Sequence, residues 1–100
     1  MTNVCVAFLF VGIVEKLLDT THASFYGPGK QAGSILAKEL IILTGRRIGA
    51  SIRMLSELTG LDPSTVSRRH DSAVRRMREE DQELQRLSAK ALKQYLELAV

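Results

Sequence analysis

Eight of the nine arginines in this chain of 100 residues lie between residues 46 and 78, and their chemistry is the clearest signal in the sequence. The same stretch holds only three acidic residues, so its net charge is +5, whereas residues 1–45 are neutral and residues 79–100 carry −2. Planar guanidinium groups match phosphate oxygens and the edges of guanine bases. The cluster predicts a face that binds a polyanion; the alternative is an ordinary solvated basic face.

The other titratable residues form no catalytic or metal-binding pattern. The two histidines, His22 and His70, are far apart, and no paired carboxylates or Ser/His/Asp set suggests catalysis. The stretch GPGKQ at residues 27–31 lacks the upstream glycine and the hydroxyl residue of a phosphate-binding loop. We therefore expect a protein that is not an enzyme and uses no cofactor, metal ion or small-molecule substrate.

The N-terminal residues bear on the cellular compartment. Cys5 is the single cysteine and cannot form an internal disulfide, which fits a reducing environment. The apolar run at residues 4–14 is too short to span a bilayer as a helix, and no basic residue precedes it as a secretory signal requires. We expect a cytoplasmic protein with no membrane partner.

Apolar residues recur at helical spacing, which predicts an all-α fold, a compact bundle of about five helices in a single domain over residues 1–100. Gly45 is expected to end the second helix, because glycine adopts the left-handed cap conformation without strain. Ala32 and Leu98 are expected on buried helix faces. The predicted elements are an apolar first helix at 1–18, a connection at 19–29, a second helix at 30–44, a basic linker at 46–49, a helix-turn-helix at 51–78 and a C-terminal helix at 82–99.

The helix-turn-helix is predicted from a short run of landmarks. Ser51 is suited to cap its first helix, and Gly60 is suited to a tight turn. Leu61 then enters the core, and Asp62 followed by Pro63 is a strong signal for the start of a second helix. These landmarks are typical of helix-turn-helix proteins that bind double-stranded DNA.

On a helical wheel, the second of these helices separates into an apolar and a polar face. Val66, His70 and Ala73 point inward, and an exposed face combines short hydroxyl side chains near its start with arginines farther along. Asp71 is expected to pair with Arg75. Asp62 is expected to act mainly as a helix cap and only secondarily to contact a base. The candidate DNA-binding residues are Asp62, Ser64, Thr65, Arg68, Arg69, Ser72 and Arg75, with Arg46, Arg47 and Lys30 outside the helix.

The sequence QAGSILAKEL at residues 31–40 and the sequence DPSTV at residues 62–66 resemble the C-terminal DNA-binding domain of the bacterial replication initiator DnaA. A variant of that domain is appended to transposases associated with repetitive extragenic palindromes, where a basic recognition helix also runs into a charged final helix. The likeness covers roughly residues 12–97. It implies a Trp-repressor-like helix-turn-helix with Asp62, Ser64 and Thr65 at the major groove.

Two positions depart from this family pattern. Pro63 stands where the motif has histidine and offers no polar group to a base, so the initiator's own target sequence is not expected. The family also has an arginine-rich loop that enters the minor groove, and the corresponding loop here, FYGPGK at 25–30, has Lys30 as its one basic residue.

Two classes of function therefore stay open. The first is sequence-specific binding of double-stranded DNA by a nucleoid-associated protein in replication, transposition or transcription, and the arginines of the recognition helix favour it. The second is a protein-interaction module of the same fold that has lost DNA binding. The weakly basic loop favours this second class, as do residues 4–9, which are apolar on all sides of a short helix and predict a homodimer through the N-terminal segment.

Overall fold

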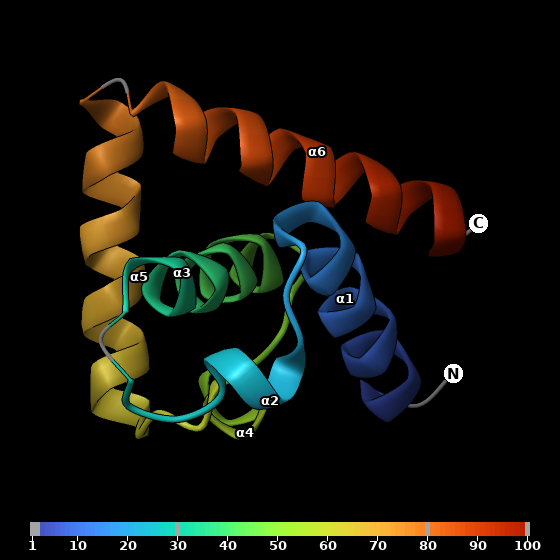
Figure 1. Ribbon diagram of the computed structural model, residues 1–100, viewed down its shortest axis with the longest axis horizontal. Coiled ribbons are helices and arrows are strands. Elements are labelled where there is room, and N and C mark those ends of the chain that lie inside the picture. Colours follow the sequence, from blue (N-terminus) through green and yellow to red (C-terminus); the bar gives the residue numbers. More distant parts are fainter. Residues whose placement is uncertain (1–2, 30, 80, 100) are drawn as a thin grey trace.

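The structure, a computed structural model, describes residues 3–29, 31–79 and 81–99, and the side chains of residues 9–29, 31–79 and 81–98. These ranges hold helices and no strand, which confirms the predicted all-α class (Figure 1). The radius of gyration is 12.3 Å, close to the value of about 13 Å for a compact domain of this length. The helices are α1 (Asn3–Leu18), α2 (His22–Phe25), α3 (Ala32–Arg47), α4 (Ile52–Thr59), α5 (Pro63–Arg78) and α6 (Gln82–Ala99).

The short helix α2 is the one element that the sequence pattern did not predict. It lies within the segment expected to be a plain connection. The hydroxyl of Thr21 accepts a hydrogen bond from the Ser24 amide and so caps its start. Phe25 at its end is buried in the core, which fixes the loop that follows.

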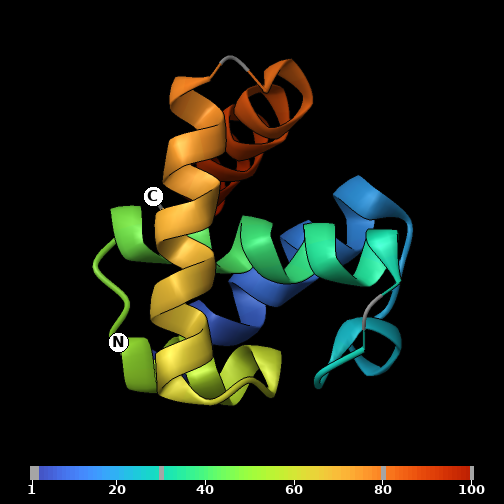
Figure 2. The same cartoon turned by 90° about the vertical axis from the view of Figure 1, so that its left-hand side faces the viewer.

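Helix α3 is the centre of the fold, and all five other helices pack against it (Figures 1 and 2). Every residue from 37 to 45 is buried, polar as well as apolar. A helix enclosed in this way needs no single apolar stripe. Ala32, expected to be buried, is exposed because it precedes this enclosed part of the helix.

The predicted bounds of this second helix, 30–44, were wrong at the C-terminal end. Gly45 lies inside α3, where an added Cβ would be 2.6 Å from a methyl group of Leu55 on α4. Its role is therefore close helix packing, and the helix ends at Arg47, followed by the C-cap Ile48 and by Gly49 with a φ of +94°. Arg46 and Arg47 thus belong to the last helical turn and not to a linker. Lys30 lies outside the described residues.

Helices α1 and α6 pack against each other and against α3. Phe10 of α1 meets Tyr95 of α6 edge to face, with ring centroids 6.1 Å apart. The carboxylate of Asp81 accepts a hydrogen bond from the Leu84 amide at 3.0 Å, which starts α6 at the predicted place. Leu98 was wrongly predicted to be buried; it is 60% exposed because α6 extends beyond the core.

The described part of α1 gives a partial view of the predicted apolar N-terminal segment. Its buried stripe includes Ile13 and Val14, as predicted, and Leu9 packs half-buried against the same core. The dimer contact was predicted for residues 4–9, and the side chains of residues 4–8 lie outside the described residues. Among the described helices, none is both long and apolar enough to cross a membrane.

Candidate nucleic-acid interface

The helix-turn-helix is built by local capping interactions at the start and end of α4. The Ser51 hydroxyl accepts a hydrogen bond from the Met54 amide at 3.1 Å, as predicted. Gly60 ends α4 with a φ of +73°, in the left-handed region. Leu61 then enters the core beside Leu55 and Val66. The turn therefore sets the angle between α4 and α5 and leaves one face of α5 exposed (Figure 2).

Asp62 is the N-cap of α5, and Thr65 supplies both of its hydrogen bonds. One carboxylate oxygen accepts from the Thr65 amide at 2.9 Å, and the other accepts from the Thr65 hydroxyl at 2.8 Å. These two bonds lower the pKa of Asp62, the amide bond most, and the positive charge of Arg68 adds to the effect. Asp62 is therefore ionised at neutral pH and holds the first turn of α5 in place.

Arg68 extends this hydrogen-bond chain along the exposed face. Its guanidinium donates to the Thr65 hydroxyl oxygen at 3.2 Å. Asp62, Thr65 and Arg68 are thus linked across the first two turns of α5. A guanidinium has five N–H donors, so this bond orients the exposed Arg68 side chain with only one of them.

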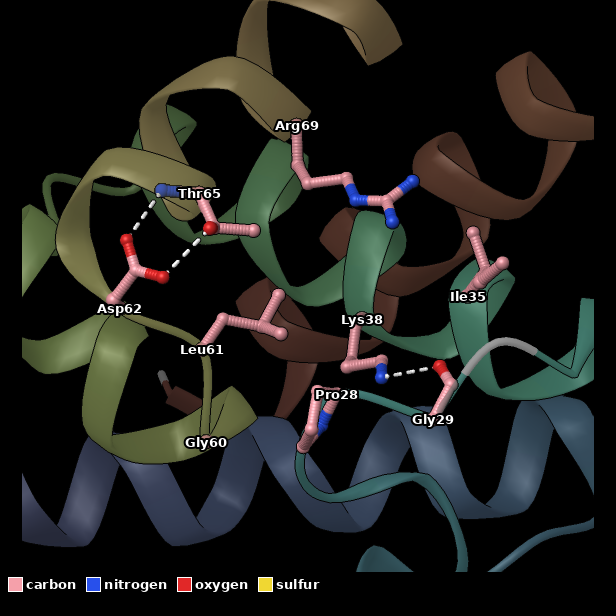
Figure 3. A pocket seen from close by; sticks show the side chains of 9 residues that line it. All are labelled: Pro28, Gly29, Ile35, Lys38, Gly60, Leu61, Asp62, Thr65 and Arg69. Carbon is pink, nitrogen blue, oxygen red and sulfur yellow. Dashed lines mark hydrogen bonds between the residues drawn. The ribbon is translucent and has the colours of Figure 1, made fainter.

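Arg69 leaves the other flank of α5 and borders a depression of about 450 Å³ (Figure 3). The opposite wall is formed by Pro28 and Gly29 of the loop after α2 and by Lys38 of α3. Lys38 is only 4% exposed, and its ammonium donates to the carbonyls of Gly27 and Gly29, the second at 3.1 Å. Burial, and then the nearby Arg69, lower the pKa of Lys38.

The loop at residues 26–29 is also tied to the end of α4. The Gly27 amide donates to the Thr59 carbonyl at 2.8 Å, and the His22 ring is hydrogen-bonded to the Leu58 carbonyl at 2.7 Å. The fold places this loop beside the first turns of α5, where Pro28 and Gly29 line the same depression as Thr65 and Arg69 (Figure 3). Loop and helix therefore form one continuous surface.

The other predicted residues on α5 lie on or beside its exposed face. Ser64 and Arg75 are exposed, and Thr65 is half-buried at the edge, as the wheel predicted. Ser72 is half-buried and lines a shallow hollow with Thr65, Arg68 and Arg69. The face thus combines short hydroxyl groups with arginines over about three turns of helix.

Two other predicted residues, both on α3, take a different position. The guanidinium of Arg46 donates to the Ala50 carbonyl at 2.9 Å, so it supports the turn between α3 and α4. Arg47 lines a groove with residues of α6 and with none of α5. The fold therefore does not bring Arg47 together with the α5 face.

Two of the charges on α5 have partners that the sequence did not predict. Asp71 lies 3.7 Å from the ring nitrogen Nδ1 of His70 and makes no ion pair with Arg75, contrary to expectation. Arg76 is ion-paired with the buried Glu39 of α3 and with Asp81 at 3.4 Å. The hydrogen bond to Glu39 is the main cause that raises the pKa of Arg76. Arg76 therefore belongs to the interior network and not to the basic face.

Comparison with protein-family models, with curated proteins and with solved structures finds no match to this chain. The resemblance to the initiator domain accordingly rests on the quoted residues alone.

Sequence reasoning missed Lys38 as a member of this surface. Its signal was present, because a lysine within the mainly apolar middle of α3 must find carbonyl or carboxylate partners when the helix is enclosed.

Proposed function

We propose that this protein binds double-stranded DNA sequence-specifically, with α5 as its recognition helix. The observation that carries the proposal is the exposed α5 face, on which short polar groups at the N-terminal end are followed by Arg68 and Arg75. Small side chains let the start of a helix approach base edges in the major groove. Arginines one and three turns farther on can then reach guanine or phosphate.

The loop at residues 26–29 supports this proposal, because it lies beside the start of α5 and is anchored by Lys38. In such an arrangement the loop faces the phosphates that flank the groove occupied by α5. The resemblance to the initiator and to the transposase-associated domain agrees with this placement. The target sequence should differ from the initiator's own, because Pro63 has no polar group for a base.

The deciding experiment is selection of bound sequences from random duplex DNA, followed by fluorescence anisotropy on the selected and a scrambled duplex. We expect affinity to fall with salt by about 0.9 log units per log unit of salt for each phosphate neutralised. Arg53→Ala is the matched control, because Arg53 is a 91% exposed arginine on α4 outside the proposed face. Binding undetectable at low salt would contradict the proposal.

The second candidate function is a protein-interaction module that retains the fold without DNA binding. It is favoured by the exposed apolar side chains Leu96 and Leu98 near the end of α6. The predicted homodimer through the N-terminal segment also stays a prediction. An absence of DNA binding combined with self-association would support this second function.

A further inference from the structure

Thr65 lies in the middle of the hydrogen-bond chain on the first two turns of α5, and its hydroxyl is engaged on both sides. A hydroxyl has one proton, and the Asp62 carboxylate, which as an ionised group can only accept, lies 2.8 Å away. The proton therefore points to Asp62. The same oxygen accepts a hydrogen bond from the Arg68 guanidinium at 3.2 Å. Thr65 thus has no proton left to donate to an acceptor on a base.

We propose that Thr65 reads no base itself and is a positioning residue, which holds the guanidinium of Arg68 ready to bind the O6 and N7 atoms of a guanine. This inference rests on the proposed DNA binding. The bond to Thr65 occupies one of five N–H donors, and a paired contact with guanine needs two of the others. Guanine presents two acceptors in the major groove, whereas adenine presents an acceptor beside a donor. Arginine can only donate, so it selects guanine.

The positions of the two side chains on α5 fit this division of roles. Thr65 is half-buried at the edge of the helix, whereas Arg68 is exposed. Residues three apart lie on the same side of a helix, so the longer Arg68 side chain extends beyond Thr65 toward a ligand on that side. A long side chain loses rotamer freedom when it binds, and this loss weakens binding. The bond to Thr65 restricts Arg68 before DNA binds and so reduces that cost.

Two variants of Thr65 separate its hydroxyl from the rest of the residue. Thr65→Val keeps the shape and the backbone amide, so the 2.9 Å bond from that amide to Asp62 still caps α5. Thr65→Ser keeps the hydroxyl. The base that Arg68 reads is the position at which Arg68→Ala relaxes the selected sequence. At this position Thr65→Val should reduce discrimination by about two- to tenfold, the cost of ordering one long side chain, and Thr65→Ser should match the parent.

A double-mutant cycle in anisotropy titrations distinguishes positioning from direct contact. In the Arg68→Ala background, Thr65→Val should cause no further loss, because the side chain that Thr65 positions is absent. Arg75→Ala is the matched control. Arg75 lies about 15 Å farther along α5, so its loss and that of Thr65→Val should multiply. Losses that multiply with Arg68→Ala as well, or a changed preference at a different base, would overturn the proposal in favour of a direct contact by Thr65.

The contact between Thr65 and Arg68 is also measured without DNA. The heteronuclear NOE of the Arg68 Nε–H group reports its motion on the picosecond-to-nanosecond timescale. The value should be higher in the parent and in Thr65→Ser than in Thr65→Val, with Arg75 unchanged in all three. Equal values at Arg68 in the parent and in Thr65→Val would overturn the positioning role even if the protein binds DNA. An ordered Arg68 with no sequence bound in the selection would overturn the proposed function, and with it the reading of guanine.

Discussion

Gly60 joins the two helices of the helix-turn-helix, and its replacement by alanine would incur two separate physical costs. The first is conformational, because its φ of +73° lies in the left-handed region that a side chain disfavours. The second is steric. An added Cβ would lie 2.7 Å from the amide nitrogen of Gly27 and 2.8 Å from the ring of Tyr26. Gly60→Ala must therefore displace the loop that packs on the turn.

Gly49 provides a matched control that isolates the first cost. Its φ is +94°, yet an added Cβ there would meet no atom within 4 Å. Gly49→Ala should lower the free energy of unfolding by about 1–2 kcal/mol from backbone strain alone. Gly60→Ala should add about 1–3 kcal/mol for the displaced loop, giving a total loss of about 2–5 kcal/mol.

Urea unfolding followed by far-ultraviolet circular dichroism measures both losses. Hydrogen exchange gives a second, local readout, because the Gly27 amide donates to the Thr59 carbonyl at 2.8 Å. Exchange at Gly27 should accelerate in Gly60→Ala beyond what global destabilisation explains, and not in Gly49→Ala. Equal losses of stability in the two variants would refute the reasoning, because the close approach of the loop would then carry no energetic weight.

Three further predictions concern the surface around α5. Arg68→Ala should cost about 1–3 kcal/mol on the selected duplex and relax specificity, whereas Arg75→Ala should weaken all duplexes alike; equal, sequence-blind losses in anisotropy titrations would contradict the recognition-helix assignment. The Asp62 carboxylate has a lowered pKa, so its stabilising contribution is complete above the usual value of 3.8 and is lost as pH falls through the lower folded value. Asp62→Asn should therefore be less stable than the parent at neutral pH, with the difference narrowing in acid unfolding curves; a pH-independent difference would count against the carboxylate. Lys38→Met should leave two loop carbonyls without their donor and cost about 1–3 kcal/mol in urea unfolding, with loss of exchange protection in the loop, and unchanged protection would show that Lys38 does not anchor it.

Structural features that depend on only a few neighbouring residues could be predicted from the sequence. Ser51 and Asp62 were assigned as caps and Gly60 as the turn, and the structure confirms all three. Each acts through backbone groups within four residues, so its geometry is largely independent of the rest of the chain. The inward face of α5 at Val66 and Ala73 followed in the same way from helical spacing.

Features that depend on distant partners could not be predicted in this way. Gly45 reads as a helix end in the sequence, but Leu55 of another helix explains its presence. Arg76 counts toward the basic face in the sequence, but the buried Glu39 engages it. Leu98 fits an apolar stripe, but the core ends before α6 does. In each case the neighbour is set by the packing of helices and not by local spacing.

Two adjacent charged residues on α3 connect the two ends of the candidate interface to the core. Lys38 holds the loop beside the start of α5, and Glu39 holds Arg76 near its end. Both are buried, so each is stable only with these partners in place. The end of α5 is thus tied to α3 through Arg76, and its start is fixed by the Asp62 cap and by the buried Leu61 and Val66. A helix held in this way can present Arg68 and its neighbours to a ligand without rearranging the fold.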